Sequence, residues 1–359
     1  LFAEGERIYI LFTDDTFTLV PTRVQEICAR LKELRKVHRI EWFCEGHIHT
    51  LYQHPEMIDA MAEAGCRRLQ LGIEAGTQKV LDAYRKGSTP AEIEAVVVRC
   101  RDAGICEIYS NIIVGGAHFT REVFEADKVF VKRLLTLSAG TLEIGVVTYW
   151  PLPETSITNH PEDYGLVLID TEFLTSIGDF PQIETPDINR WEIAAFAQEL
   201  RVEIEAHAKT ILCDGIVPDV RMLSWMDGYM SEKGLWVRMM QQLPHYYAFY
   251  HMRACGEAVI SAELGIEALR DAHPMRTVPL YSCSEVQGER SFRLFGDDYT
   301  GLIVDVLIYA TGKLSICEIA ARLAQEDAYR QQEGEEIVYA VCEAALLLEQ
   351  RKLLVFSRY

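Results

Sequence analysis

The stretch Leu69–Gly87, which reads LQLGIEAGTQKVLDAYRKG, decides the fold of this chain. Its first part, Leu69–Ile73, is apolar enough for a buried strand, and a helix is expected over Gln78–Arg85 after a short turn. Glu74 follows the expected strand directly. Because parallel α/β sheets bind ligands at the carboxyl ends of their strands, Glu74 is a candidate binding residue.

Strands and helices alternate on both sides of this stretch. Further strands are expected at Arg7–Thr13, Ile40–Cys44, Glu107–Val114 and Thr141–Thr148. Amphipathic helices are expected between them, at Val24–Leu34, Pro55–Ala64, Pro90–Ala103 and Arg121–Leu137. A repeat of roughly 30–35 residues indicates parallel βαβ construction and an α/β fold. A doubly wound sheet and a partial barrel both satisfy this pattern.

Right-handed crossovers place the carboxyl ends of parallel strands on one rim. We therefore expect one rim to carry the residues that follow the strands: Asp14, Asp15, Glu45, Glu74, Gly115, Gly116, Thr148 and Tyr149.

Composition excludes several classes of protein. The 359 residues are 49% hydrophobic, which is enough for a sizeable core, and no apolar run reaches the length of a membrane span. A formal net charge of −19 argues against nucleic acid as the main partner. The 10 cysteines form no Cys-x-x-Cys pair, so we expect free thiols and a reducing, cytoplasmic compartment.

The pattern changes after Tyr149. A loop-rich segment precedes a long helix expected at Asp187–Ile211, and Asp219–Met252 is rich in Met, Trp and Tyr, which suits either a core or a substrate pocket. Ala258–Leu269 is predicted as a helix and His273–Gln287 as a linker. We therefore divide the chain into residues 1–150, a mainly helical accessory or substrate region 151–285, and a small module 286–359.

The last module has a simple predicted order. A short strand at Phe292–Phe295 is followed by three helices and a final strand at Lys352–Phe356. Ser315 is placed to cap the second helix.

Five short motifs resemble the radical S-adenosylmethionine (radical SAM) family. Gly72-Ile73-Glu74-Ala75-Gly76 resembles the family's fourth strand, with Ala75 in place of Ser. The other motifs, with their departures from the family, are Asp14-Asp15-Thr16-Phe17, typical of the cobalamin-linked branch; Ala64-Gly65-Cys66; Asn111–Gly116, followed by Ala117-His118 where the family ends in Leu-Pro-Gly; and Pro153-Glu154-Thr155 for Pro-Gly-Thr.

The resemblance implies a partial (β/α) barrel and a set of residues that bind SAM. Asp14, Asp15 and Glu74 would lie near its methionyl amino group. Lys86 would pair with the carboxylate of SAM, and Arg85 is the alternative for this role. A basic residue at a solvated helix end, without a role in binding, is the other interpretation of Lys86. The remaining candidates are Gly115 and Gly116, whose backbone would approach the adenosyl group, and Thr148.

Two histidines after the second strand have two interpretations. His47 and His49 alternate along an extended segment, so they could face the site as acid–base groups or lie in a surface turn.

The resemblance also implies a [4Fe–4S] cluster held by three cysteines in a Cys-x-x-x-Cys-x-x-Cys motif, which this sequence lacks. We expect these cysteines, and a cobalamin-binding domain, upstream of Leu1, so that the chain is a fragment of a longer enzyme. A descendant that has lost the cluster is the alternative.

The expected activity is formation of a 5′-deoxyadenosyl radical from SAM, with cobalamin-dependent methylation as one outcome. The last 65 or so residues contain Tyr309-Ala310-Thr311-Gly312, then Ile316, Ile319 and Leu323, and then Leu347, Leu348 and Leu353. This pattern resembles a PqqD-like peptide-recognition winged helix, which implies a precursor peptide bound at the edge of the strand Phe292–Phe295. A generic winged helix that covers the barrel or forms a dimer is the alternative. A non-catalytic peptide-binding scaffold and a tRNA-modifying enzyme stay open as other functions, although the acidic charge disfavours the latter.

Overall fold

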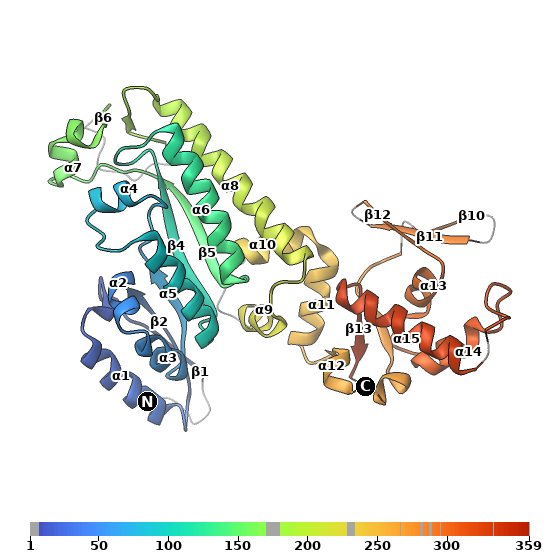
Figure 1. Cartoon of the computed structure of the whole chain (residues 1–359). Coiled ribbons are helices and arrows are strands. Elements are labelled where there is room, and N and C mark those ends of the chain that lie inside the picture. The colour runs from blue at the N-terminus through green and yellow to red at the C-terminus, as the bar shows by residue number, and fades with distance from the viewer. Residues whose placement is uncertain are drawn as a thin grey trace. The chain divides into compact units, whose positions relative to one another are not determined.

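The computed structural model describes residues 7–169, 180–227, 234–265, 267–280, 283–286, 289–294, 296–332 and 334–358. The chain forms two compact units, the first made of residues 1–221 and 233–236 and the second of 222–232 and 237–359 (Figure 1). Among the described residues, no helix combines the length and the apolar character that crossing a membrane requires.

A five-stranded parallel sheet forms the centre of the first unit. Its strands follow the chain order: β1 (Arg7–Leu11), β2 (Arg39–Gly46), β3 (Cys66–Leu71), β4 (Glu107–Val114) and β5 (Leu142–Thr148). The predicted α/β class is therefore confirmed. Because all five strands are parallel, Asp14, Glu74, Gly115 and Thr148 follow or end strands at the same edge of the sheet, as the sequence predicted.

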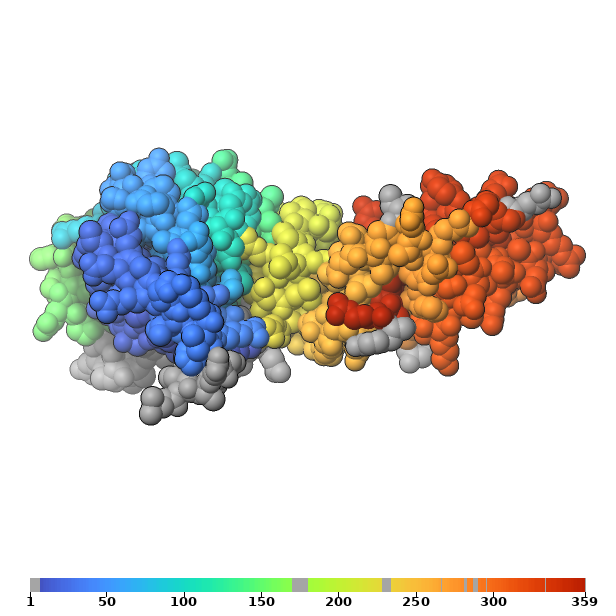
Figure 2. Space-filling view, turned by 90° about the horizontal axis from the view of Figure 1, so that it is seen from below, coloured from blue at the N-terminus to red at the C-terminus, as the bar shows by residue number. Residues whose placement is uncertain are grey.

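Helices cover one face of this sheet (Figure 1). They are α1 (Pro21–Leu34), α3 (Glu56–Glu63), α5 (Pro90–Ala103) and α6 (Arg121–Ser138), with the short α2 (Ile48–Gln53) and α4 (Gln78–Ala83) at the loops. Trp42, on this face, is fully buried, and its indole N–H donates to the Ala64 carbonyl at 3.0 Å. The early helices also form part of the surface that Figure 2 shows in blue.

Local signals explain where the helix α5 begins and ends. The Thr89 side chain accepts from the Glu92 N–H while Glu92 bonds back to the Thr89 N–H, which completes a capping box. Pro90 occupies the first turn, and Gly104 ends the helix with φ of 94°. These boundaries agree with the prediction.

Strand β3 ends two residues earlier than predicted. Gln70 pairs with Tyr109, and Glu74 forms a bridge to Ile112. The chain after β3 therefore uses four residues to advance as far as β4 does with three. The Ser110 hydroxyl fills the gap, donating to the Leu71 carbonyl at 2.6 Å and accepting from the Ile73 N–H at 3.1 Å. The extra residue makes a bulge, which is why Glu74 leaves the sheet with φ of 64°.

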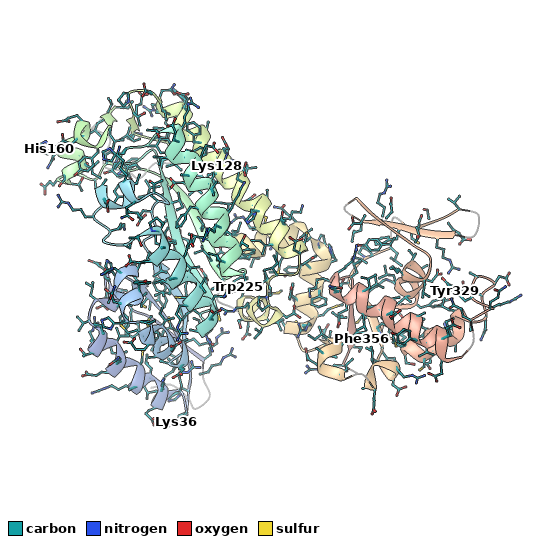
Figure 3. The ribbon with its side chains drawn as sticks, viewed as in Figure 1. Lys36, Lys128, His160, Trp225, Tyr329 and Phe356 are labelled. Carbon is teal, nitrogen blue, oxygen red and sulfur yellow. The ribbon has the colours of Figure 1, made fainter. Side chains whose placement is uncertain are left out.

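The remainder of the first unit contains α7 (Ser156–Asn159), the short strands β6 (Val167–Leu168) and β7 (Ile183–Glu184), and the long helix α8 (Arg190–Cys213). Lys128 of α6, which is labelled in Figure 3, binds Glu199 of α8 at 2.6 Å, and this ion pair joins the two helices.

The second unit mixes helices with two small antiparallel sheets. Its helices are α9 (Asp219–Met226, which begins in the first unit), α10 (Leu235–Gln242, likewise), α11 (Pro244–Ala254), α12 (Ser261–Leu264), α13 (Leu302–Tyr309), α14 (Ile316–Leu323) and α15 (Glu335–Gln350). One sheet has the order β10 (Cys283–Val286), β11 (Glu289–Leu294), β12 (Asp297–Thr300), and the other β8 (Ala258–Val259), β13 (Leu354–Ser357), β9 (Pro274–Arg276). The three predicted helices and the cap at Ser315 are confirmed.

Two predictions in this unit are wrong. The described part of the expected helix Ala258–Leu269 contains β8, the short α12 and the start of a 3-10 helix at Ala268–Asp271. The expected linker His273–Gln287 contains β9 and β10, with Gln287 itself outside the described residues. Both errors have one cause. β8 and β9 are stabilised by pairing with β13, about 80 to 100 residues later, and the local hydrophobic pattern does not indicate this pairing.

The strand predicted at Phe292–Phe295 is not an edge. Phe292 pairs with Cys283 on one side and with Tyr299 on the other, and its side chain is 1% exposed. Phe295 lies outside the described residues. A peptide therefore cannot add to β11, because both of its sides already carry strands.

Candidate functional site

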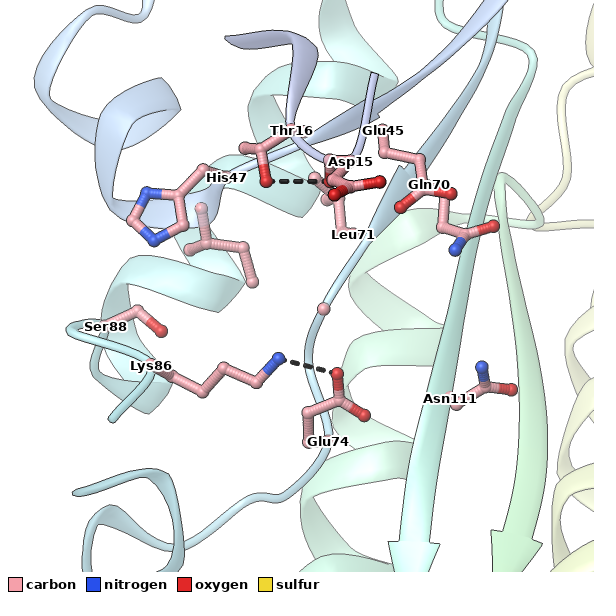
Figure 4. Close-up of a pocket in the computed structure, with 13 residues that line it drawn as sticks. Asp15, Thr16, Glu45, His47, Gln70, Leu71, Glu74, Lys86, Ser88 and Asn111 are labelled. Carbon is pink, nitrogen blue, oxygen red and sulfur yellow. Dashed lines mark hydrogen bonds and ion pairs between the residues drawn. The ribbon is translucent and has the colours of Figure 1, made fainter. Parts of the chain in front are cut away.

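A cavity of about 200 Å³ opens at the carboxyl edge of β1, β2 and β3 (Figure 4). Its lining combines the ends of these strands with the loop after β3 and one residue of β4: Asp15, Thr16, Glu45, Gly46, His47, Ile48, Gln70, Leu71, Gly72, Glu74, Lys86, Ser88 and Asn111. Three of the predicted site residues are brought together here, namely Asp15, Glu74 and Lys86.

Glu74 and Lys86 form an ion pair in the wall of this cavity. Lys86 Nζ lies 2.7 Å from Glu74 Oε1, and the side chains are 30% and 18% exposed (Figure 4). Gly72 makes room for the pair, because a Cβ at this position would lie 2.8 Å from Lys86 Nζ and 3.1 Å from Glu74 Oε1. The charges thus sit close together while part of each side chain stays open to the cavity.

The cavity carries more negative than positive groups. Asp15 follows β1 and Glu45 lies near the end of β2, and no ion pair joins either of them to another described residue. With Glu74 they make three carboxylates against the single ammonium of Lys86. Such a site attracts a second cation, for example the ammonium group of an amino acid.

His47 faces the cavity and His49 does not line it. The His47 backbone N–H donates to the Thr18 hydroxyl at 2.7 Å, and its ring Nδ1 accepts from the Thr50 N–H at the start of α2. Partial burial lowers the pKa of His47, which favours a neutral imidazole. His49 instead binds Glu92 of α5 at 3.2 Å.

The other predicted residues lie on the rim but do not line the cavity. Asp14 binds Arg23 at 2.6 Å, and Thr148 ends β5. A Cβ at Gly115 would lie 2.6 Å from Ile193, and one at Gly116 would lie 1.7 Å from the Tyr84 hydroxyl. Protein side chains thus fill the space where a Cβ would lie at these two glycines, and the approach of their backbone to an adenosyl group stays a prediction.

Sequence reasoning missed three residues of the cavity wall that could have been found. Gln70 and Asn111 project from the face of the sheet opposite the helices, where β3 and β4 alternate polar and apolar residues. The alternation is readable in Arg68-Leu69-Gln70-Leu71, whereas Asn111 is the single polar residue before an apolar run. Gly72 was part of the family motif without a steric role.

The fold and cavity define a parallel α/β protein with a ligand site at the carboxyl ends of its strands. Residues 1–130 match the family described as the Radical SAM superfamily, which supports that superfamily for this part of the chain. A protein of Pyrococcus horikoshii named as an uncharacterized methyltransferase is 33% identical over 125 residues, which are 35% of this chain. The match spans 26% of the length of that relative.

Two solved structures are similar at lower identity. Coproporphyrinogen III oxidase from Escherichia coli, described as a radical SAM enzyme, is 16% identical with a TM-score of 0.41, over 56% of this chain and 41% of its own. The methyltransferase TsrM from Kitasatospora setae, solved with cobalamin and a [4Fe–4S] cluster, is 18% identical with a TM-score of 0.41, over 54% and 42%.

Two departures from the family motifs have a shared backbone explanation. His118 and Glu154 stand where the family has glycine, and they adopt φ of 55° and 63°. This left-handed conformation is the one that glycine adopts most readily. His118 and Glu154 therefore adopt a glycine-like backbone conformation although neither is glycine.

The residues of the cavity fit one end of SAM but not the cluster. A volume of about 200 Å³ is below the ~300–1,000 Å³ of typical ligand pockets, and it suits a zwitterionic amino-acid end. For a metal, the described residues contain no group of three or more His, Cys, Asp or Glu side chains able to hold it. Cys44 and Cys66, on strands beside the cavity, are fully buried.

Proposed function

We propose that this chain is part of a radical SAM enzyme and that its cavity binds the methionyl end of SAM. The observation that carries the proposal is the Glu74–Lys86 pair, which lines one small cavity with two further carboxylates. An incoming ammonium group would bind Glu74 together with Asp15 or Glu45. Lys86 would then donate to the carboxylate of the ligand, so that both ends of the zwitterion are paired.

In radical SAM enzymes, SAM and a [4Fe–4S] cluster supply a 5′-deoxyadenosyl radical. The described residues do not hold such a cluster, so this chain's own contribution is to bind and orient the amino-acid end of SAM. Under this proposal the cluster ligands come from outside the described residues. Gln70 and Asn111 offer amide groups on the open face of the sheet, next to the cavity, where a second reactant would lie.

We extend the proposal to methyl transfer with cobalamin as a further cofactor. Its support is the name of the Pyrococcus relative and the Asp14-Asp15-Thr16-Phe17 motif. A precursor peptide bound through residues 286–359 is the proposed substrate partner. Within the described residues, the edge strands of the β10-β11-β12 sheet are β10 and β12, so the peptide would add to one of these.

Calorimetric titration of SAM into the 359-residue chain tests the proposal. We expect measurable binding that Glu74→Gln weakens by about 1.5–3 kcal/mol, because a charge-assisted hydrogen bond to the ammonium is lost. Glu26→Gln, at an exposed carboxylate of α1, is the matched control for lost charge. Equal affinity of all three proteins would reject the role of Glu74.

A scaffold without catalytic activity is the second candidate, favoured by the lack of a metal-holding group among the described residues. Iron content of the protein purified without oxygen from its native source separates the two. About four iron atoms per protein supports the enzyme, and iron-free protein supports the scaffold.

A further inference from the structure

The loop that carries Glu74 is held on its far side by a buried carboxylate. The Gly76 N–H donates to Asp127 Oδ1 of α6 at 2.7 Å, and Asp127 is 3% exposed. Neither the sequence motifs nor the cavity lining includes Asp127, which lies 51 residues after Gly76.

Two sets of contacts fix the backbone around Glu74. On the β4 side, the Glu74 N–H donates to the Asn111 carbonyl at 3.0 Å, and the Glu74 carbonyl accepts from the Ile113 N–H at 2.9 Å. On the α6 side, Gly76 packs so closely that a Cβ would lie 2.6 Å from Phe130 Cβ. Asp127 therefore supplies the polar contact on the α6 side of a loop whose Glu74 has a left-handed backbone.

We propose that Asp127 is a positioning residue for the Glu74 carboxylate, and that its ionised form strengthens the hold of the cavity on an ammonium group. The inference deepens the proposed function and rests on it. An ionised carboxylate accepts a charge-assisted hydrogen bond from Gly76, which is roughly twice as strong as a bond to the neutral acid. Protonation loosens this bond and with it the loop that aims Glu74.

The surroundings of Asp127 allow both forms near neutral pH. Burial raises the pKa of Asp127 to about 7, against the lowering effect of the Gly76 N–H. Tyr84, at the end of α4, also faces Asp127, and burial raises the pKa of that phenol far above its ordinary value.

The charged side chains near Asp127 on the neighbouring helices form ion pairs with other residues. Lys128, next on α6, binds Glu125 and, across from α8, Glu199. Lys132 of α6 binds Glu203 of α8, and Arg133 binds Glu94 of α5 at 2.8 Å. None of these bonds involves Asp127, so its titration is governed by burial and by Gly76.

Selective labelling reads the Gly76 amide directly. The sequence contains four Ala–Gly steps, so carbonyl-labelled Ala with amide-labelled Gly gives four resonances, from Gly65, Gly76, Gly104 and Gly140. We expect the Gly76 resonance to titrate with a midpoint near pH 7 and the other three to serve as internal controls. In Asp127→Asn, which keeps an oxygen acceptor, this titration disappears.

The proposal is overturned if the Gly76 resonance does not move between pH 5 and 9, or if the movement persists in Asp127→Asn. Thermal unfolding of the variant confirms that it is folded before the comparison is made.

The affinity for SAM supplies the second readout. We expect the wild-type chain to bind SAM roughly fivefold more tightly at pH 8 than at pH 6, and the ratio to fall in Asp127→Asn. An unchanged ratio in the variant overturns the link to ligand binding, because His47 and SAM itself titrate equally in both proteins. Absence of SAM binding at both pH values rejects the proposed function and this link, while the Gly76 resonance still decides whether Asp127 controls the loop.

Discussion

Lys86 and Glu74 lie 12 residues apart in the chain, yet their side chains meet at 2.7 Å above Gly72. The bulge after β3 turns Glu74 toward this position, and the chain returns after α4 to bring Lys86 opposite. One strand–helix stretch therefore supplies both an anion and a cation to the same cavity.

Removing the charge of Lys86 or of Glu74 should show which end of the ligand each side chain binds. Lys86→Met should weaken binding of L-methionine by about 1.5–3 kcal/mol and leave L-methioninol, which has no carboxylate, nearly unchanged. Glu74→Gln should weaken both ligands, because both carry the ammonium. Competition against SAM measures this, with Lys79→Met, which lies at a different cavity, as the control. Equal losses for both ligands in Lys86→Met would contradict the assignment of Lys86.

Gly72→Ala should weaken ligand binding at little cost to the fold. The new methyl group would meet the flexible end of Lys86 at 2.8 Å and displace it from Glu74. We expect a loss of stability below about 1 kcal/mol, since a surface side chain can move aside. Thermal unfolding and SAM titration check the two halves; unchanged affinity would show that the close pair is unimportant.

Asp127 should make the stability of the protein depend on pH in a defined direction. The pKa of its carboxyl is raised in the folded state from 3.8 to about 7, so its stabilising contribution is complete below about pH 4 and is lost as the pH rises through 7. Asp127→Asn should therefore be more stable than wild type at pH 8, by about 2–4 kcal/mol, and similar at pH 4. Denaturant titrations of both proteins test this, and a constant difference across pH would contradict it.

The sequence predicted an element of the fold correctly where the residues that determine the element lie within it or beside it. The α5 boundaries followed from Thr89, Pro90 and Gly104, and β4 was predicted to the residue, because these signals are local. The end of β3 was missed since Ser110, 37 residues after Ile73, provides the bonds that open the bulge. β8 and β9 were missed for the same reason, as their pairing partner is near the chain's end.

The candidate site shows the same difference between residues marked by local signals and residues that depend on distant contacts. Asp15, Glu74 and Lys86 line one cavity because the family motif marks strand ends, and parallel strands share an edge. Gly115 and Gly116 were assigned from the family resemblance of Asn111–Gly116 together with the conformational freedom of glycine. Which atoms fill the space beside a glycine depends on distant residues, here Ile193 and Tyr84, and the sequence pattern does not contain that information.

Glu154→Gly should stabilise the first unit. Glu154 holds a φ of 63° that an L residue adopts at a cost and glycine does not, whereas glycine loses more entropy on folding. We expect a net gain of about 0.5–1 kcal/mol. Glu154→Ala, which removes the charge but keeps the Cβ, should show no gain. If both variants unfold at the same temperature, backbone strain at this turn is not the cause.

A buried network should stabilise the second unit. Asp305 is 5% exposed and accepts from Arg290 at 2.7 Å and from the hydroxyl of Tyr329, which is labelled in Figure 3. Asp305→Ala should cost about 1–3 kcal/mol, because Arg290 and the Tyr329 hydroxyl lose a buried acceptor while Arg290 keeps Glu285 and Glu326. Replacing both, as Asp305→Leu with Arg290→Met, should cost less than the sum of the single changes. Additive losses in calorimetric unfolding would show that the pair is not coupled.

Saturation-transfer NMR of SAM on the 359-residue chain tests the central claim most directly, because it reports which end of the ligand contacts the protein. We predict that the methionyl α, β and γ protons receive the strongest saturation, and that Glu74→Gln reduces it while Glu26→Gln preserves it. Saturation confined to the adenine protons, or equal in wild type and Glu74→Gln, would contradict it.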